Sequence, residues 1–292
     1  MSMKLSSVFE LLLLAALWGG SFLFMRIAAP AFGPVWLIEC RVLLASLALL
    51  PLILRAKQWP AVKDNFKSLF IVGCINSALP FLFLAYASLS LPAGYTSIIN
   101  ATAPLFGTVI SAVWFQEKLT VSRLAGLILG FLGVTVLIGL QPMQMTVAVG
   151  SSIVAGLLAA VMYAIAAPYA KRYLDGVPPL AIAVGSQAGA AIALLPLLPF
   201  SIPAALPSGR IVLAVLALAL FSTAIAYLLY FRLIQTIGSS KALTVTYLVP
   251  VFAVLWGAIF LGEVVTVAML IGCCLILLGT AIANGLIVRS HR

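Results

Sequence analysis

The sequence has very few charged side chains for its length. Of its 292 residues, 16 are Lys or Arg and 6 are Asp or Glu, so charged residues make up only 8% of the chain. About a quarter of the residues are charged in a typical water-soluble domain, so this chain has too few charges to cover a surface in water. Disorder is excluded too, because 64% of the residues are hydrophobic and disordered chains are poor in such residues. The composition therefore predicts an integral membrane protein.

The chain also lacks the residues that most hydrolytic, metal-dependent and ATP-dependent sites require. Its single histidine is His291, so neither a zinc-binding His-Glu-x-x-His motif nor a Ser-His dyad can form. The two aspartates, Asp64 and Asp175, fall in expected loops and cannot form a buried dyad. None of the four cysteines has a histidine at metal-ligand spacing, and no glycine-rich loop ending in Lys-Ser/Thr is present. We therefore expect no enzyme activity, no cofactor and no metal site.

Long apolar stretches fill most of the sequence. A helix needs roughly 20 residues to cross the roughly 30 Å hydrocarbon core of a bilayer. Runs such as 11–17 are apolar at every position, whereas the strands of a membrane β-barrel would alternate apolar and polar residues. The sequence thus predicts an all-α integral membrane protein with ten transmembrane helices. The expected helices cover residues 7–29, 34–54, 66–89, 92–115, 120–140, 147–173, 178–199, 210–235, 239–261 and 266–287.

The basic residues indicate which side of the membrane each loop faces. If the N-terminus is inside, 13 of the 16 basic residues fall on the cytoplasmic side, and Arg26, Arg41 and Arg210 remain toward the outer side. Basic loops are favoured on the cytoplasmic side by the insertion machinery and by anionic lipids. We therefore expect a multi-pass protein with both termini in the cytoplasm. The same bias accounts for the net charge of +10 without a nucleic-acid partner.

The two halves of the sequence repeat each other. An offset of 146 residues relates the later part of each half, and an offset of 145 relates the earlier part. The pairs at the first offset are Pro104 and Pro250, Glu117 and Glu263, Thr120 and Thr266, Gly126 and Gly272, and Gly133 and Gly279; those at the second include Trp18 and Tyr163, and Arg26 and Lys171. We therefore divide the chain into an N-terminal repeat, residues 1–145, and a C-terminal repeat, residues 146–292.

Each repeat contains five expected helices, so the two repeats must enter the membrane in opposite directions. Inverted repeats are related by a pseudo-two-fold axis in the membrane plane, which allows two nearly equivalent states that differ by exchanging the halves. This architecture favours alternating-access transport. A gene duplication can also simply enlarge a helical bundle.

The repeats carry the motifs of a known family. Each half has a proline followed thirteen residues later by Glu-x-x-Thr and a glycine-rich helix, and the first helix contains Trp18-Gly19-Gly20-Ser21. Over essentially the whole chain, these features resemble the drug/metabolite transporter superfamily, in particular its EamA-type exporters. The stretch Tyr163-Ala164-Ile165-Ala166 of the second repeat departs from the motif, so the two halves are not strictly symmetric there. The resemblance implies export of amino acids (neutral ones, including aromatic and Met-like) and related small metabolites across a bacterial inner membrane.

Other transport functions stay open as alternatives. The chain could be a channel-like facilitator or a lipid flippase, and the superfamily also carries drugs, sugars and nucleotide sugars. A nucleotide-sugar carrier would need basic residues in its cavity, and none is expected there. No Asp or Glu reaches the expected midplane of helices three, four, eight or nine, which disfavours a proton relay and suits zwitterionic or uncharged solutes. Glu39 and Arg41, two residues apart, are expected to point to different helix faces.

Polar and aromatic residues on the expected membrane helices mark a candidate substrate site. Polar groups are costly in hydrocarbon, so they should face a cavity or a partner helix. Small and hydroxyl residues can also serve only to let helices pack closely. The expected substrate-binding residues are Trp18, Asn76, Ser77, Phe81, Asn100, Tyr163, Thr223, Tyr227, Thr246 and Tyr247.

Prolines and glycines occur at matching places of the two halves. The prolines indicate hinges within helices, and the glycines indicate close packing between helices. Pro104 and Pro250 each remove a helical hydrogen bond near mid-membrane, which makes either a hinge, our expectation, or a static bend. The glycines of the fifth and tenth helices suit close packing, either within one chain or between two protomers. We expect the partners to be the lipid bilayer and a small-molecule substrate, with the protein a monomer or a homodimer.

Overall fold

The computed structural model describes residues 4–114, 116, 119–140, 144–203 and 206–285. The expectations that concern Glu117, Lys118, Arg289, His291 and Arg292 fall outside the described residues. Every regular element in the described part of the chain is a helix. Eight apolar helical segments there are long enough to cross a membrane by length and composition, and two further apolar helices have 17 residues each. Seventeen residues of helix span about 25 Å, within the range of membrane helices. The prediction of an all-α membrane protein with ten helical spans is therefore confirmed.

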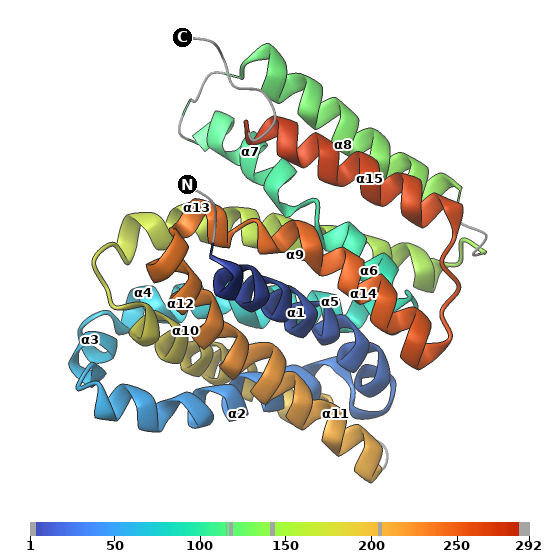
Figure 1. Cartoon of the computed structure of the whole chain (residues 1–292). Helices are drawn as coiled ribbons and strands as arrows, with labels where there is room; N and C mark the ends of the chain where they lie inside the picture. Colours follow the sequence, from blue (N-terminus) through green and yellow to red (C-terminus); the bar gives the residue numbers. More distant parts are fainter. Residues whose placement is uncertain (1–3, 115, 117–118, 141–143, 204–205, 286–292) are drawn as a thin grey trace.

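The first repeat supplies the first five spans, shown from blue to green in Figure 1. The first two spans are single helices, the third contains a π-helical turn, and the fourth is broken into two helices. A short extra helix, α3, lies between the second and third spans. The elements are α1 (Leu5–Phe32), α2 (Pro34–Arg55), α3 (Trp59–Asp64), α4 (Phe66–Gly73), the π-helical turn η1 (Cys74–Ala78), α5 (Leu79–Ala87), α6 (Ala93–Asn100), α7 (Ala103–Trp114) and α8 (Val121–Gly139).

The second repeat follows the same order of spans, shown from yellow-green to red in Figure 1. Its third span again contains a π-helical turn, and a four-residue helix precedes its fourth span. The elements are α9 (Val147–Tyr173), α10 (Pro179–Leu194), the 3-10 helix η2 (Leu195–Phe200), α11 (Gly209–Ala219), the π-helical turn η3 (Leu220–Ile225), α12 (Ala226–Ile237), α13 (Ser239–Ala242), α14 (Val245–Leu261) and α15 (Val267–Ala283).

The two repeats are packed into each other rather than side by side. The first helix of one repeat lies against the third and fourth spans of the other: α1 contacts α11, α12 and α14, and α9 contacts α5, α6 and α7. The second spans, α2 and α10, contact each other, and so do the fifth spans, α8 and α15. Each of these contacts has its counterpart when the halves are exchanged, as two inverted repeats require. The division at residues 145 and 146 stays a prediction.

The fourth span of the first repeat is interrupted where the sequence predicted one continuous helix over 92–115. Helix α6 ends at Asn100 and α7 begins at Ala103. Pro104 has no N–H to bond the carbonyl of Asn100, and its ring crowds that turn. The Thr102 hydroxyl donates to the Ile99 carbonyl oxygen at 2.7 Å and so satisfies one of the carbonyls left at the end of α6.

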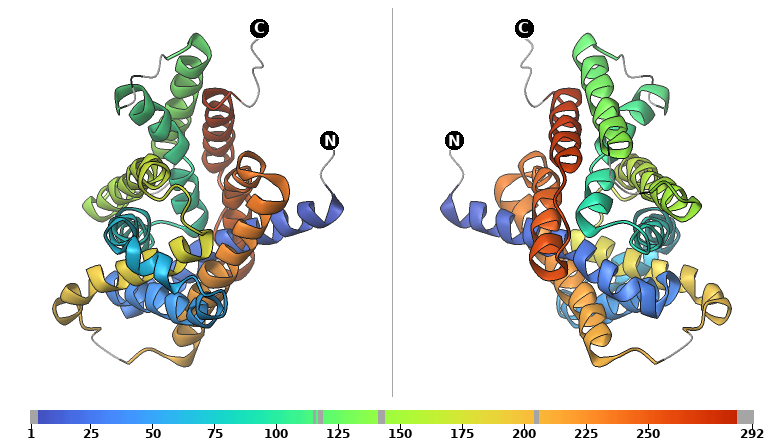
Figure 2. Two further views of the ribbon diagram at one scale, coloured as in Figure 1. Left: turned by 90° about the vertical axis from the view of Figure 1, so that its left-hand side faces the viewer. Right: turned by 90° about the vertical axis from the view of Figure 1, so that its right-hand side faces the viewer.

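The glycines of α8 and α15 pack these two helices against each other within one chain. Figures 1 and 2 show α8 and α15 side by side at one edge of the molecule. A Cβ atom on Gly133 would lie 2.8 Å from the Ile276 nitrogen, and one on Gly272 would lie 2.9 Å from Cβ of Leu137. Any side chain larger than hydrogen would separate the helices there. Packing inside one chain therefore accounts for the glycines, and the oligomeric state stays a prediction.

Candidate functional site

A cavity of about 390 Å³ lies between spans of both repeats. This volume is within the range of small-molecule sites, roughly 300–1,000 Å³. Of the ten residues predicted to bind substrate, eight line the cavity, and so do both predicted hinge prolines, Pro104 and Pro250. The eight residues are Trp18, Asn76, Phe81, Asn100, Tyr163, Tyr227, Thr246 and Tyr247. The structure thus brings together residues up to 229 positions apart in the sequence.

Further residues line the cavity that were outside the predicted set. Ser97, Ser222 and Tyr230 lie on the same helix faces as predicted residues, so the spacing along α6, η3 and α12 could have identified them. The remaining polar and aromatic additions are Ser21, Phe22, Arg41 and Thr280. Of these, Arg41 and Thr280 come from the second and tenth spans, which the sequence did not place at the cavity.

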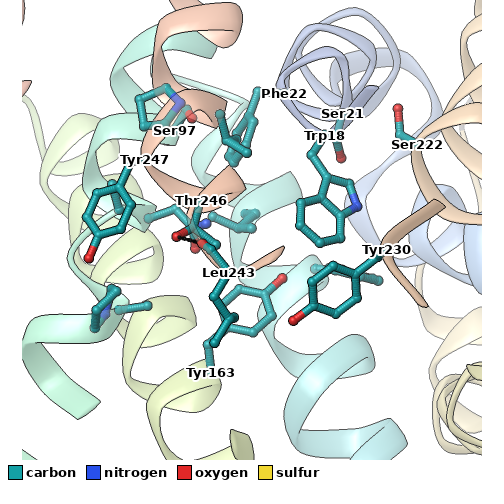
Figure 3. Close-up of a pocket in the computed structure, with 18 of the residues that line it drawn as sticks. Trp18, Ser21, Phe22, Ser97, Tyr163, Ser222, Tyr230, Leu243, Thr246 and Tyr247 are labelled. Carbon is teal, nitrogen blue, oxygen red and sulfur yellow. Dashed lines mark hydrogen bonds between the residues drawn. The ribbon is translucent and has the colours of Figure 1, made fainter. Parts of the chain in front are cut away.

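The Trp18-Gly19-Gly20-Ser21 motif brings α1 close enough to α14 to form one wall. A Cβ atom on Gly19 would lie 2.7 Å from Cβ of Phe252 and 2.9 Å from the Ala253 nitrogen, so only glycine allows this crossing. Trp18 and Ser21 flank the contact and both line the cavity. In Figure 3 the Trp18 ring lies beside the Tyr230 ring, with 5.2 Å between ring centroids. The glycine therefore sets the position of the aromatic wall.

Two π-helical turns lie at equivalent places in the repeats and present polar residues. Cys74, at the start of η1, and Leu220, at the start of η3, are 146 residues apart. Asn76 in η1 and Ser222 in η3 line the cavity, whereas the predicted residues Ser77 and Thr223 are fully buried behind the lining. Since π-helical turns interrupt a helix and are frequent at functional sites, their matched positions support a binding role for this region. The sequence contained no signal for them.

The hydroxyls behind the lining bind side chains from the second span of the opposite repeat. Ser77 Oγ accepts a hydrogen bond from Gln187 Nε2 at 3.0 Å, and Thr223 Oγ1 accepts one from Arg41 Nε at 3.0 Å. Thr223 in turn donates to the Leu218 carbonyl oxygen at 2.9 Å. Ser77 and Thr223 therefore hold neighbouring side chains in place, and neither is exposed to the cavity.

Several buried oxygen atoms at the cavity have no hydrogen-bond partner. They belong to Ser97, Asn100, Ser222 and Thr280, and all four residues line the cavity. Most buried polar atoms in proteins are hydrogen-bonded, so four such atoms gathered at one cavity need an explanation. A polar ligand that enters the cavity would satisfy them.

Arg41 contradicts the expectation that no basic residue would reach the cavity. It lines the cavity with a side chain that is only 4% exposed, and its Cζ atom lies 3.5 Å from the centroid of the Phe81 ring. The expectation was wrong because α2 contacts η3 and α5 and approaches the cavity from the side. As expected, Arg41 forms no ion pair with Glu39. Glu39 is buried at 3% exposure, and neither of its carboxylate oxygens has a hydrogen-bond partner.

The residues at the two ends of the cavity differ in their exposed fraction. Leu243, just before α14 begins, lines the cavity and is 50% exposed, so it lies at the mouth. Phe22, Phe81 and Ser97 line the opposite end and are at most 6% exposed. The cavity therefore opens toward the start of α14 and is closed in the direction of the α14–α15 connection.

A network centred on Arg26 and Glu263 lies beyond the closed end, one helical turn past Phe22. Arg26 Nη1 donates to the carbonyl oxygens of Ser88 at 2.8 Å and Leu89 at 2.9 Å, and its Nε lies 4.0 Å from Glu263 Oε1. Oε1 also accepts the Ala93 N–H at 2.9 Å, at the start of α6. A carboxylate is stabilised there because the first N–H groups of a helix have no partner within the helix. This Arg26–Glu263 network ties together the ends of α1, α5, α6 and α14.

The repeat counterpart of Arg26 at the other end of the cavity makes no such contacts with the described residues. Lys171, the repeat counterpart of Arg26, is exposed in the last turn of α9, with no hydrogen bond or ion pair to any residue that the structure describes. Arg26 is therefore bonded in the first repeat, whereas Lys171 has no partner among the described residues of the second.

The sequence profile of the EamA-like transporter family matches this chain twice, over residues 5–139 and 150–285. An "Uncharacterized transporter" of Archaeoglobus fulgidus is 26% identical over 92% of this chain and 95% of its own length. The "Probable terminal-alkyne amino-acid exporter" of Streptantibioticus cattleyicolor is 25% identical over 97% of this chain and 95% of its own length. The "Probable amino-acid metabolite efflux pump" of Salmonella typhimurium is 26% identical over 93% of this chain and 92% of its own length.

A solved structure has the same fold. It superimposes with a TM-score of 0.64 at 20% sequence identity and covers 97% of this chain and 98% of its own. At this identity the likeness concerns the fold alone, and it supports the arrangement of helices around the cavity.

Proposed function

This chain belongs to the EamA-like transporter family of the drug/metabolite transporter superfamily, and we propose that it exports amino acids and related small metabolites by alternating access. The expected substrates are neutral amino acids, including aromatic and Met-like ones. The expected membrane is the bacterial inner membrane, with both termini in the cytoplasm. Two relatives carry names that refer to amino-acid export or efflux, which supports this substrate class.

The cavity is the observation that carries this proposal. It is about 390 Å³ in volume, it lies between the repeats, and four of its lining residues have buried oxygens without a partner. An amino acid has an ammonium group that donates hydrogen bonds, and Asn100 Oδ1 is available to accept one. The rings of Trp18, Tyr163 and Tyr227 form a partly aromatic wall, which suits an apolar side chain.

The difference between the two ends of the cavity supports alternating access. The Arg26–Glu263 network joins helix ends on the side where α14 connects to α15, and the mouth lies at the start of α14, near Leu243. With the basic loops inside, the mouth faces the cytoplasm. We therefore propose that the structure is the cytoplasm-open state, which an exporter needs for loading its substrate. In the other state, the network would separate and the equivalent end of the second repeat would close.

The two prolines are proposed to act as hinges in this exchange. Pro104 follows the break between α6 and α7, whereas Pro250 lies inside the continuous helix α14. Both line the cavity, so a bend at either would change the cavity and the helix end together.

The test is transport by the purified protein in liposomes. Vesicles preloaded with unlabelled phenylalanine or methionine should accumulate the labelled amino acid faster than empty vesicles, and uptake should saturate. Counter-transport requires a carrier that exchanges its substrate, so a linear, unsaturated flux without counter-transport would indicate a channel-like facilitator instead. A panel of sugars, nucleotide sugars and cationic drugs, with and without a pH gradient, completes the experiment. If none of the amino acids moves and another class does, the proposed substrate class is wrong.

A further inference from the structure

We propose that Arg41 binds the carboxylate of the transported solute, and that this contact, more than any contact with the ammonium group, decides which solutes bind. The inference rests on the transport function proposed above and names the chemical group that the cavity selects. It starts from the position of Arg41, whose side chain is only 4% exposed and still lines the cavity.

The guanidinium group of Arg41 has little to bind within the protein. Its Nε donates to Thr223 Oγ1 at 3.0 Å, and its Nη1 lies 3.9 Å from the sulfur of Met25, which is a weak acceptor. Among the described residues, no carboxylate lies within 4.0 Å of Arg41. A buried charge without a counterion is costly. Arg41 is such a charge, and it lies at a cavity, where an anionic ligand would supply the missing counterion.

Nη2 of Arg41 has no hydrogen-bond partner among the described residues, and Nη1 has only the weak contact with the Met25 sulfur. Thr223 holds Nε from one side, and the Phe81 ring lies under the plane of the guanidinium at 3.5 Å from Cζ. Such contacts orient the planar group without using all of its five N–H donors. A guanidinium binds a carboxylate through two parallel hydrogen bonds, which makes it more selective for this group than an ammonium would be.

The second repeat contains the same contact without the charge. Gln187 lies 146 residues after Arg41, and Ser77 lies 146 residues before Thr223. Gln187 Nε2 donates to Ser77 Oγ at 3.0 Å, just as Arg41 Nε donates to Thr223 Oγ1. Gln187 is one residue beyond the position that the offset of 145 between α2 and α10 would give. A neutral amide therefore suffices for the structural contact, and the charge of Arg41 is left for a different use.

No described acidic residue lines the cavity to balance an ammonium group. The ammonium would meet neutral acceptors such as Asn100 Oδ1, whereas the carboxylate would meet a full positive charge. Hydrogen bonds to charged groups contribute more than bonds between neutral groups. Removing the carboxylate charge from a solute should consequently weaken binding more than removing the ammonium charge.

Three ligands with the same benzyl side chain test this inference by calorimetry on the purified, full-length protein. Phenylalanine is a zwitterion, N-acetylphenylalanine carries only the carboxylate charge, and phenylalaninamide carries only the ammonium charge. We expect N-acetylphenylalanine to bind within about threefold of phenylalanine, and phenylalaninamide to bind roughly 10- to 100-fold more weakly. If phenylalaninamide binds as well as N-acetylphenylalanine, the inference is wrong, whatever any variant does.

Arg41→Gln removes the charge and keeps a donor for Thr223, as Gln187 provides for Ser77. The variant should lose roughly 10- to 100-fold in affinity for both carboxylates while its affinity for phenylalaninamide does not fall. Arg41→Lys should lose less, because it keeps the charge but not the paired hydrogen bonds. Arg55→Gln is the matched control, since it makes the same change at an exposed position of the same helix.

The outcomes separate this inference from the proposed function. Wild type that transports phenylalanine, together with an Arg41→Gln variant of unchanged affinity, would overturn the role of Arg41 and leave the amino-acid transporter intact. Wild type that neither binds nor transports any of the three ligands would overturn both. Size-exclusion profiles in detergent verify that each variant is folded before its affinity is measured.

Discussion

The two repeats place equivalent residues in different environments. Arg26 in the first repeat bonds to two carbonyl oxygens and lies 4.0 Å from Glu263, whereas its counterpart Lys171 is exposed and free of described partners. In the second spans, Arg41 and Gln187 make matching hydrogen bonds, yet only one of them is charged. The backbone is thus arranged with approximate two-fold symmetry, and the side chains depart from that symmetry.

Each departure has its own consequence. The difference between Arg26 and Lys171 concerns which end of the cavity is closed, and under the alternating access proposed above it would reverse when the repeats exchange conformations. The difference between Arg41 and Gln187 is permanent, because it is a difference in sequence. In the proposed mechanism, the inverted repeat allows the two states, and the unmatched Arg41 gives the cavity its preference for a carboxylate. Comparing paired variants in the two repeats tests this division.

The largest effect is expected when the closed end loses its carboxylate. Glu263→Ala removes the acceptor of the Ala93 N–H and the negative charge beside Arg26, which keeps its bonds to the Ser88 and Leu89 carbonyl oxygens. We expect a cost of roughly 3 kcal/mol, or about 100-fold in the ratio of the two states. A membrane-impermeant thiol reagent applied from the outside should then label Ser97→Cys in a chain with Ser at the four native cysteine positions. In the same cysteine-free background with Glu263 intact, the reagent should label Ser97→Cys only from the cytoplasmic side.

Lys171→Ala is the paired control for this prediction. Since Lys171 bonds to no described residue in the present state, its loss should not raise labelling from the outside. Equal labelling of Ser97→Cys from the outside, with and without Glu263, would contradict the role of the Arg26–Glu263 network.

Asn100→Ala should lower the affinity for every amino-acid substrate, because Asn100 is expected to bind the shared backbone groups. The loss of one hydrogen bond costs roughly 1–3 kcal/mol, which is a factor of about 5 to 150. Its repeat counterpart is Thr246, whose hydroxyl already donates to the Leu243 carbonyl oxygen at 2.8 Å. Thr246→Ala should therefore cost less. Competition assays across the amino-acid panel measure both; unchanged affinity in Asn100→Ala would show that the substrate binds elsewhere.

Pro104→Ala and Pro250→Ala should slow transport while leaving substrate affinity nearly unchanged. Restoring a helical hydrogen bond changes the barrier between states more than it changes the cavity. We expect a roughly tenfold decrease in rate for Pro104→Ala, about 1.4 kcal/mol in the barrier, and less for Pro250→Ala, since α14 is already continuous. Counter-transport rates and binding affinities, measured together, test this. Wild-type rates in both variants would make the prolines static bends.

The smallest effects are expected at the aromatic wall. Trp18→Ala should weaken binding of aromatic and thioether side chains by about fivefold, roughly 1 kcal/mol, and change small side chains less. Tyr163→Ala should act in the same direction, and the ratio between phenylalanine and alanine affinities is the measurement. A uniform loss for all side chains would place Trp18 near the shared backbone groups of the substrate instead.

Much of this arrangement could be predicted from the sequence because it depends on local patterns. The hydrophobic runs predicted the ten spans, and the repeat predicted that they form two inverted halves. Spacing along the helices identified eight residues of the cavity, including Asn100 and Tyr227. Residues on one helix face share an environment, so periodicity alone indicates which of them face away from lipid.

Contacts between residues far apart in the sequence could not be predicted from such local patterns. Ser77 and Thr223 were predicted as substrate contacts, but they are buried behind the residues that line the cavity. Their burial depends on two π-helical turns that could not be predicted from the sequence. Arg41 was expected outside the cavity, because a basic residue near the outer end of a helix usually indicates orientation only. Its place in the cavity depends on how α2 crosses η3 and α5.

The sequence by itself determined that the chain crosses the membrane ten times and that its halves are inverted, since hydrophobic length and an odd number of spans per repeat require this. Only the tertiary structure decided which end of the cavity is closed and which charge it contains. The Arg26 bonds join residues 62 and 63 positions apart, and the Arg41 bond joins residues 182 apart. Such contacts form when helices pack, and the free energy of that packing depends on the whole bundle rather than on any one segment.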